Sequence, residues 1–189
     1  MNSRSLWLLA LTFAALAFSN GSATATSEEA AWNALRAGGI ALFRHANAPG
    51  VGDPPGMRLD DCSTQRNLDE DGRIQARRIG DAFRSRNIQM GAVLASQWCR
   101  ATETAQLAFP GLVRVDPVFN SFFGDQQAGE LQTEAARRLL QGWQGPGALF
   151  VSTHQVNITA LTGLVPASGE GIVLGSGGGG LAVIGRIRP

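Results

Sequence analysis

The stretch GGIALFRHANAPG, residues 38–50, holds the strongest structural signal of the sequence. Its apolar run, residues 40–43, predicts a short buried strand, and this run ends abruptly in Arg44 and His45. The chain has only two histidines among its 189 residues. We therefore expect this strand to deliver two functional side chains to one end of a sheet.

Short apolar runs alternate with helical patterns along the rest of the chain. This alternation is typical of an α/β domain with a largely parallel sheet. The predicted strands are 40–43, 92–95, 112–115 and 148–151, followed by a terminal hairpin of residues 172–174 and 181–187. The predicted helices are 71–86, 101–108, 129–143 and 156–161, and residues 46–69 are predicted to form a loop.

The glycine run of residues 176–180 lies between the two hairpin strands. It is similar to a phosphate-binding loop only superficially, because it lacks the Gly-Lys-Ser/Thr ending and a following helix. We interpret it as a flexible hairpin loop. No internal repeat or linker divides the chain, so residues 26–189 are expected to form a single domain.

The N-terminal segment has the pattern of a secretory signal. Arg4 precedes an apolar run of residues 6–18, and the sequence Ala-Thr-Ala at 23–25 fits a small-x-small cleavage site. A membrane anchor is the alternative, but the run is shorter than the roughly 20 residues that a spanning helix needs. We expect a signal peptide over residues 1–25, a periplasmic or secreted location, and no stable membrane anchor after cleavage.

Composition narrows the classes of partner. The formal net charge is only +1, so no global basic field favours nucleic-acid binding. All 16 basic residues are arginines, whose forked side chain suits phosphate or carboxylate groups. The two cysteines, Cys62 and Cys99, favour a disulfide over a metal site in an exported chain, although the sequence leaves open whether they approach each other.

Three predicted strand ends carry chemically capable side chains. The first ends in Arg44 and His45, the second leads to Arg100, and the fourth ends in His154 just before a helix. Ligands of open α/β sheets bind beyond the carboxyl ends of the strands, so these four residues are expected to line one pocket. The amides at the start of the helix after His154 would add donors for an anion.

Two guanidinium groups and a helix start favour a compact anion such as phosphate. The chain has no Walker motif and no obvious cluster of magnesium-binding carboxylates, which favours phosphoryl transfer without a metal or cofactor. A neutral imidazole can attack phosphorus and form a phosphohistidine. Nearby cations keep such a ring neutral and stabilise the charge on the phosphoryl oxygens.

The same motifs resemble those of a known family. Leu-Phe-Arg-His-Ala, residues 42–46, is similar to the Arg-His-Gly signature of the histidine phosphatase, or phosphoglycerate-mutase-like, superfamily. Residues 95–105 resemble its second motif, Ser-x-x-x-Arg-Ala-x-Glu-Thr, and residues 151–155 resemble its third, a strand that ends in histidine. Residues 68–76 match the helix start between the first two motifs, and the resemblance extends over about residues 36–187.

This resemblance implies a three-layer α/β/α sandwich and a covalent phosphohistidine mechanism. By position, His45 would be the nucleophile, and Arg44, Arg100 and His154 would bind the phosphoryl group. Ala46 replaces the usual glycine, which is tolerable if the backbone there keeps a negative φ.

The general acid is the least defined part of this prediction. Many family members carry a glutamate shortly after the strand that follows the second motif, whereas this chain has Asn120 in that region. Asp125 is the next candidate and Glu130 stands behind it, but Asp125 could equally be a solvated loop residue, and the acid could be absent.

Three further polar residues could have a structural role, and two of them could instead contribute to the pocket. Asn47 either points into the pocket or caps the loop. Glu103 is expected to brace the helix that carries Arg100. Glu170 either lines the rim of the pocket or caps a strand.

Together these features predict an exported, metal-independent phosphomonoesterase that acts through a phosphohistidine on His45. Its expected partner is a phosphorylated small molecule or an envelope glycan, such as a sugar phosphate or another envelope phosphoester, and not a nucleic acid. The alternative is a non-catalytic phosphate- or phosphoglycan-binding protein on the same fold. A histidine-based metal site is the remaining rival, but two histidines without a clear acidic partner do not favour it.

Overall fold

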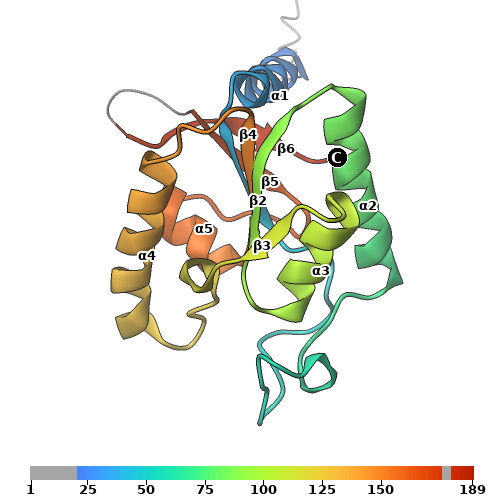
Figure 1. The fold of residues 1–189 in the computed structure, drawn as a ribbon, viewed down its shortest axis with the longest axis vertical. Helices are drawn as coiled ribbons and strands as arrows, with labels where there is room; N and C mark the ends of the chain where they lie inside the picture. Colours follow the sequence, from blue (N-terminus) through green and yellow to red (C-terminus); the bar gives the residue numbers. More distant parts are fainter. Residues whose placement is uncertain (1–20, 176–179) are drawn as a thin grey trace, which may run out of the picture.

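The computed structural model describes residues 21–175 and 180–189. The apolar run of the predicted signal and most of the predicted glycine loop, residues 176–179, lie outside the described residues. The described chain forms a central six-stranded sheet with helices on both faces (Figure 1). The predicted α/β/α sandwich is thus confirmed.

The sheet has the strand order β3-β2-β4-β1-β5-β6. Strands β3, β2, β4 and β1 run parallel, and β5 and β6 follow as an antiparallel pair at one edge. The bounds of the strands are β1 Ile40–Arg44, β2 Met90–Ala95, β3 Val113–Val115, β4 Ala148–Thr153, β5 Gly171–Gly175 and β6 Ala182–Ile187. The predicted strands and terminal hairpin are therefore confirmed within one to two residues at most ends.

Alternating strand residues build two separate cores. Ala41 and Phe43 of β1 face the cluster under α1, α2 and α3, where Phe43 stacks on Phe150 at a centroid distance of 5.0 Å. Ile40 and Leu42 point to the opposite face, into the cluster under α4 and α5. Both faces of the parallel strands are buried, which explains why they are near-continuous apolar runs in the sequence.

The four predicted helices begin one to three residues earlier than predicted, while α2 and α4 also end one and two residues earlier, and capping aspartates precede α2 and α4. Asp69 accepts a hydrogen bond from Gly72 N–H at 2.7 Å and so starts α2 one residue early. The bounds of the helices are α1 Gly21–Arg36, α2 Glu70–Ser85, α3 Cys99–Ala108, α4 Gln126–Gln141 and α5 Gln155–Thr162, with short 3-10 turns η1 Cys62–Thr64 and η2 Pro117–Phe119.

Helix α1 is the element that the sequence reading missed. Its residues Ala31, Trp32 and Leu35 are buried in the core, and the Trp32 ring meets Phe83 edge-on at a centroid distance of 5.3 Å. Only three apolar positions mark this face, and the helix begins within the segment assigned to the signal peptide. None of the helices in the described ranges is long and apolar enough to cross a membrane.

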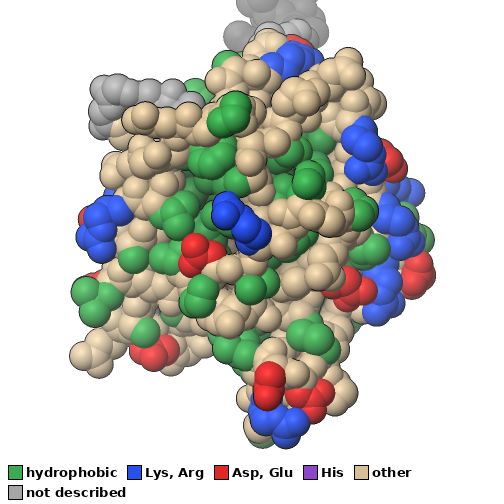
Figure 2. Space-filling model, in the orientation of Figure 1, with side chains coloured by type: hydrophobic (Ala, Val, Ile, Leu, Met, Phe, Trp, Pro, Cys, Tyr) green, Lys and Arg blue, Asp and Glu red, His purple; other side chains and the backbone are tan. Residues whose placement is uncertain are grey.

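Charged side chains of both signs alternate along the surface of α2, at the right-hand edge of Figure 2. Arg77 pairs with Glu70 at 3.0 Å, and Arg84 pairs with Asp81 at 2.8 Å. Such exposed pairs contribute little to stability, so packing on the sheet must hold this helix in place.

Candidate active site

A pocket of about 590 Å³ opens at the carboxyl ends of the parallel strands. Arg44, His45, Arg100 and His154 all contribute to its lining. Their predicted convergence is confirmed, while their chemical roles stay predictions. The strand register explains why they meet. Arg44 pairs with Thr153 across β1 and β4, so His45 and His154, the next residue of each strand, lie side by side.

His45 is held by a hydrogen bond at each ring nitrogen. Its Nδ1 lies 2.8 Å from the carbonyl oxygen of Ala46, which can only accept, so Nδ1 carries the proton. Its Nε2 accepts a hydrogen bond from Nε of Arg100 at 3.2 Å. The pKa of His45 is lowered to about 3, chiefly by burial; the Ala46 contact opposes this shift, and the charges of Arg100, Arg66 and Arg44 act in the same direction as burial. The ring is therefore neutral, and the lone pair of its Nε2 faces Arg100.

Arg100 connects the two sides of the pocket. It stands in the first turn of α3 and is 3% exposed, although it carries a full charge. Its Nε contacts His45, while Nη1 and Nη2 form a two-pronged ion pair with Asp53 at 2.6 and 3.0 Å. A single guanidinium group therefore binds both the ring of His45 and a carboxylate in the pocket.

Arg44 reaches the pocket from the end of β1. Its Nη1 donates to the carbonyl oxygen of Pro166 at 3.2 Å, whereas its buried Nε has no hydrogen-bond partner in the described part of the chain. Burial and the charge of Arg100 lower the pKa of Arg44. A buried donor without a partner is costly, so this side chain is suited to an anionic ligand.

His154 ends β4 and precedes α5 without capping it. Its Nε2 shares a hydrogen bond with the hydroxyl of Ser96 at 2.8 Å, and its ring meets that of His45 at a centroid distance of 5.5 Å. Complete burial lowers its pKa well below the ordinary value, and His45 and the arginines add to the effect. Both histidines are thus neutral at the edge of a positively charged pocket.

The backbone at Ala46 fits a residue with a side chain. Asn87 is the one non-glycine residue with positive φ in the described chain, so Ala46 keeps the negative φ that its replacement of glycine requires. The Ala46 amide donates to Oγ1 of Thr104 at 3.0 Å, and the same hydroxyl donates to the Arg100 carbonyl at 2.7 Å. Thr104 therefore fixes the position of β1 relative to α3.

Asp53, Arg66 and Trp98 are among the pocket residues that the sequence analysis did not predict. Asp53 and Arg66 come from the loop between β1 and α2, and Trp98 precedes α3. Arg66 donates to the carbonyl oxygens of Gly52, at 2.7 Å, and Ala48, which folds the loop back on itself. The Pro- and Gly-rich sequence around Asp53 was a signal for a loop, but it did not show where that loop would lie.

The comparison with known families agrees with this geometry. The sequence profile of the histidine phosphatase superfamily, branch 1, matches residues 40–144, from β1 to just beyond α4. The chain belongs to the histidine phosphatase superfamily. This membership supports phosphatase activity. A search of curated proteins found no match.

Three solved structures share this fold. SixA from Agrobacterium tumefaciens has 20% identity and a TM-score of 0.53, over 80% of this chain and 98% of that one. The protein histidine phosphatase SixA complexed with tungstate has 16% identity and a TM-score of 0.58, over 80% and 97%. Phosphoglycerate mutase from Thermus thermophilus has 15% identity and a TM-score of 0.55, over 80% and 99%.

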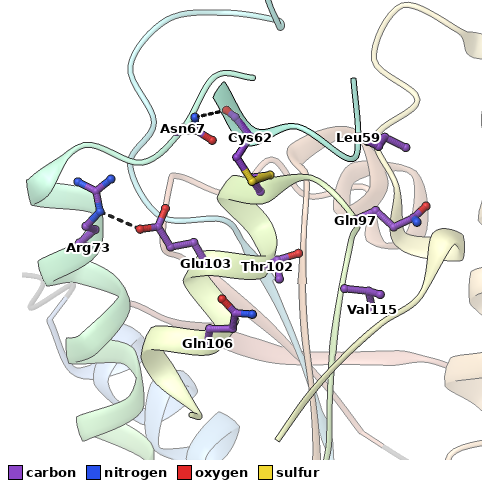
Figure 3. A pocket seen from close by; sticks show the side chains of 10 residues that line it. Leu59, Cys62, Asn67, Arg73, Gln97, Thr102, Glu103, Gln106 and Val115 are labelled. Carbon is purple, nitrogen blue, oxygen red and sulfur yellow. Dashed lines mark hydrogen bonds and ion pairs between the residues drawn. A yellow bond between two sulfur atoms is a disulfide. The ribbon is translucent and has the colours of Figure 1, made fainter. Parts of the chain in front are cut away.

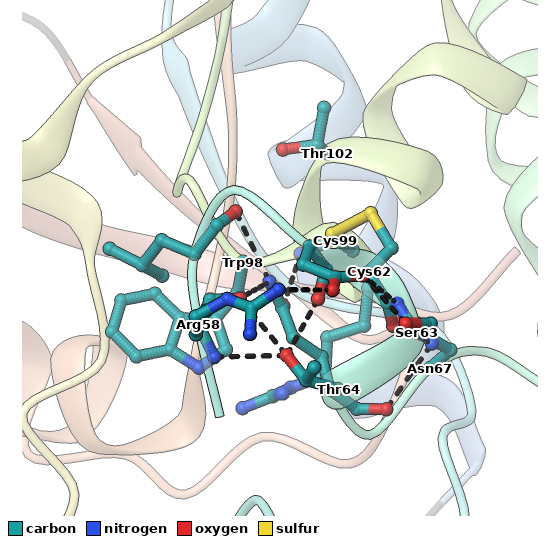
Figure 4. Close-up of a disulfide and its surroundings, with 12 residues drawn as sticks. Arg58, Cys62, Ser63, Thr64, Asn67, Trp98, Cys99 and Thr102 are labelled. Atoms are coloured by element: carbon teal, nitrogen blue, oxygen red, sulfur yellow. Dashed lines mark hydrogen bonds and ion pairs between the residues drawn. A yellow bond between two sulfur atoms is a disulfide. The ribbon is translucent and has the colours of Figure 1, made fainter. Parts of the chain in front are cut away.

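A disulfide joins Cys62 to Cys99 and ties the pocket loop to the helix of Arg100 (Figure 4). The cysteine pair that the sequence left open is therefore bonded in this chain. Around it, Gln65 accepts from the amide of Cys99 at 2.9 Å, and Asn67 donates to the carbonyl of Cys62 at 2.6 Å. The 37-residue separation of the two cysteines encloses the end of the loop together with α2 and β2, and the bond fixes the loop to α3 at Cys62.

The residues predicted as acids lie outside the pocket lining. Asp125 accepts from the amide of Ala128 at 3.1 Å and caps α4, with its carboxylate exposed. Glu130 is exposed on the same helix. Asn120 accepts from the amide of Gln97 at 2.9 Å and so supports the segment before Trp98. The role predicted for Asp125 gains no support from this placement, because an aspartate just before a helix satisfies its free amides.

The other polar residues singled out in the sequence have structural partners. Asn47 donates to Asp69 at 2.8 Å, which corresponds to the loop-capping reading. Glu103 pairs with Arg73 at 2.8 Å and joins α3 to α2. Glu170 is buried and ion-paired with two arginines of the C-terminal segment, Arg186 at 3.0 Å and Arg188 at 3.1 Å, so it anchors that segment.

A second hollow lies beside the disulfide, on the outer side of α3 (Figure 3). The Glu103 carboxylate in it already binds Arg73, and neither histidine reaches it. The chemically capable set is therefore in the first pocket. Within the described residues, no three His, Cys, Asp or Glu side chains form a group that could hold a metal ion.

Proposed function

We propose that this protein is an exported, metal-independent phosphomonoesterase in which His45 attacks phosphorus and carries the phosphoryl group. Arg44, Arg100 and His154 would hold the phosphoryl oxygens. The observation that carries this proposal is the state of His45: a buried, neutral ring whose Nε2 meets the Arg100 guanidinium at 3.2 Å. A nucleophile beside a cation that binds the oxygens of its target is suited to phosphoryl transfer.

The rim of the pocket supports a proposal for the substrate class. Val51 is 88% exposed and Phe123 is 64% exposed, and both stand at the pocket together with Met57. These side chains can cover an uncharged or partly apolar leaving group beside the charged base of the pocket. We propose a phosphorylated small molecule or an envelope glycan as substrate, such as a sugar phosphate or another phosphoester of the cell envelope.

The direct test is hydrolysis of p-nitrophenyl phosphate by the purified protein, with a chelator present and His45→Ala as the comparison. We expect turnover that survives the chelator and disappears in the variant. Brief incubation with a 32P-labelled ester should leave an acid-labile label on the wild-type chain only, because a phosphohistidine is cleaved by acid.

Other outcomes would contradict particular parts of the proposal. Turnover that a chelator abolishes would contradict the metal-independent mechanism. A folded protein that binds inorganic phosphate but turns over no ester between about pH 4 and 8 would favour the phosphate- or phosphoglycan-binding alternative. Export is tested separately, by locating the protein in cell fractions.

A further inference from the structure

Asp53 is the one carboxylate among the described residues that line the pocket. It lies in the loop between β1 and α2, eight residues after His45, and its side chain is 15% exposed. The negative charge of this carboxylate would repel an anionic ligand, whereas the arginines of the pocket would attract one. Its presence therefore calls for a functional explanation.

The Asp53 carboxylate accepts four hydrogen bonds. One oxygen binds Nη1 of Arg100 at 2.6 Å and the amide of Arg66 at 3.2 Å. The other binds Nη2 of Arg100 at 3.0 Å and the indole Nε1 of Trp98, also at 3.0 Å. These bonds lower the pKa of Asp53 against the opposing effect of its burial. Without a ligand, Asp53 is therefore an ionised partner of the Arg100 fork.

A phosphoryl group would compete with Asp53 for this fork. For attack, phosphorus must come within roughly 3–3.5 Å of His45 Nε2, and Arg100 already contacts that atom through Nε. The phosphoryl oxygens would then lie over the Arg100 guanidinium and accept from its outer nitrogens. Asp53 would give up Arg100 but remain beside it, since Trp98 and the Arg66 amide still hold its carboxylate.

The contacts of Arg100 place the attacking nitrogen of His45 at one end of its guanidinium group and the carboxylate of Asp53 at the other. His45 touches the Nε end of Arg100, and Asp53 touches the Nη end. In an in-line displacement, the leaving oxygen is on the side of phosphorus away from the attacking nitrogen. With the phosphoryl oxygens over the Arg100 guanidinium, this side would be the one toward Asp53.

We propose that Asp53 is the catalytic acid and base of the reaction, held on Arg100 until the phosphoryl group takes its place. This inference rests on the proposed function. A carboxylate released from a cation and set beside a phosphoryl dianion gains affinity for a proton. The ester itself can supply that proton, since the second pKa of a phosphate monoester is about 6.

The two half-reactions balance. In the first, the bond between His45 Nε2 and phosphorus forms, the bond from phosphorus to the leaving oxygen breaks, and the Asp53 proton moves to that oxygen. In the second, water attacks phosphorus and gives its proton to the Asp53 carboxylate, while the bond from phosphorus to nitrogen breaks. Asp53 then passes this proton to the departing inorganic phosphate and returns to Arg100 as a carboxylate, and His45 is neutral again.

The test uses the full chain and compares Asp53→Asn with wild type on two esters. p-Nitrophenolate leaves easily without a proton, whereas the alkoxide of glycerol 2-phosphate does not. We expect kcat/KM of Asp53→Asn to fall roughly 10²–10⁴-fold on glycerol 2-phosphate and less than about 10-fold on p-nitrophenyl phosphate. Asp60→Asn is the matched control, because this loop aspartate has an 88% exposed side chain, and both rates should stay at the wild-type level.

Equal losses on both esters, or no loss on either, would overturn the role of Asp53 as an acid. Wild-type protein that turns over neither ester would overturn the proposed function and this inference with it. If Asp53→Asn does not fold, the wild-type enzyme provides the test. Its kcat/KM should depend only weakly on the leaving-group pKa across substituted aryl and alkyl phosphates, because an acid protonates the leaving oxygen. A steep dependence would overturn the inference.

Discussion

Nε of Arg100 donates to Nε2 of His45 across 3.2 Å, and so an arginine of α3 touches the ring nitrogen that would attack phosphorus. The same arginine is almost completely buried, and its outer nitrogens point into the pocket. The position of one guanidinium therefore determines both the orientation of the ring and the place where an anion can bind.

Replacement of this arginine by lysine tests that double role. An ammonium group keeps the charge but cannot contact His45 and an anion with separate, coplanar nitrogens. We expect Arg100→Lys to lower kcat/KM on p-nitrophenyl phosphate by roughly 10²–10³-fold. Arg114→Lys, on an exposed residue of β3, is the control and should keep the wild-type rate. Similar rates for the two variants would contradict the role of Arg100.

The pH dependence of stability should reveal the buried histidine. The folded pKa of His45 is about 3 and the unfolded value is near 6.5, so between these limits the unfolded chain binds a proton that the folded chain does not. The free energy of unfolding should therefore rise with pH across this window. Urea midpoints between about pH 4.5 and 7 measure it.

His154 acts in the same direction, since burial lowers its pKa as well. The variant His45→Asn should thus retain only part of the rise. A wild-type urea midpoint that stays flat or falls from about pH 4.5 to 7 would show that His45 is not buried in its neutral form.

The disulfide should matter for both stability and turnover. Replacing Cys62 and Cys99 together by serine frees the loop that carries Asp53 and Arg66, and Cys62 is exposed enough for a reductant to reach. We expect a loss of roughly 2–4 kcal/mol in the free energy of unfolding, together with a lower kcat/KM. Chemical denaturation with and without reductant measures the first effect. Unchanged midpoints after confirmed reduction would count against it.

Gly72 marks a close approach between α2 and the strand end of His45. A Cβ atom there would lie 2.1 Å from the carbonyl oxygen of Asn47. We expect Gly72→Ala to cost about 1–3 kcal/mol of stability, because backbone must move to admit the methyl group. Thermal melting compares it with Arg78→Ala, an exposed change on the same helix that should stay within about 0.5 kcal/mol of wild type.

Cleavage of the predicted signal peptide would change the mass of the protein by a measurable amount. If the chain is exported and cut after Ala25, the protein recovered from the periplasm or medium begins at Thr26. Such a product would keep Ala31, Trp32 and Leu35, the buried face of α1, and should melt cooperatively. Intact-mass spectrometry of the recovered protein decides. A cytoplasmic protein with its N-terminal segment intact would refute the export proposal.

The sequence predicted the strands well because both faces of the parallel strands are buried, as in β4, which is buried along its whole length. Continuous apolar runs bounded by glycine and proline are a clear signal. Arg44, His45, Arg100 and His154 could be placed together because each follows such a run, and parallel strands bring their carboxyl ends to one edge.

The loop residues of the pocket gave no comparable signal. Asp53 and Arg66 reach the pocket because the 46–69 segment folds back through the disulfide and through contacts with Gly52 and Ala48. The residues that make these contacts follow no helical or strand periodicity in the sequence, so no pattern predicts them. Asp125 was favoured in the sequence because it is an acid in a suitable region, but a helix start nearby uses its carboxylate.

Helix α1 packs against β5 and β6, the last strands of the chain, and at Gly185 the two approach so closely that a Cβ would lie 2.5 Å from the Ser27 carbonyl. The packing of α1 can therefore be completed only after β6 has been synthesised, because residues far apart along the chain meet at this contact.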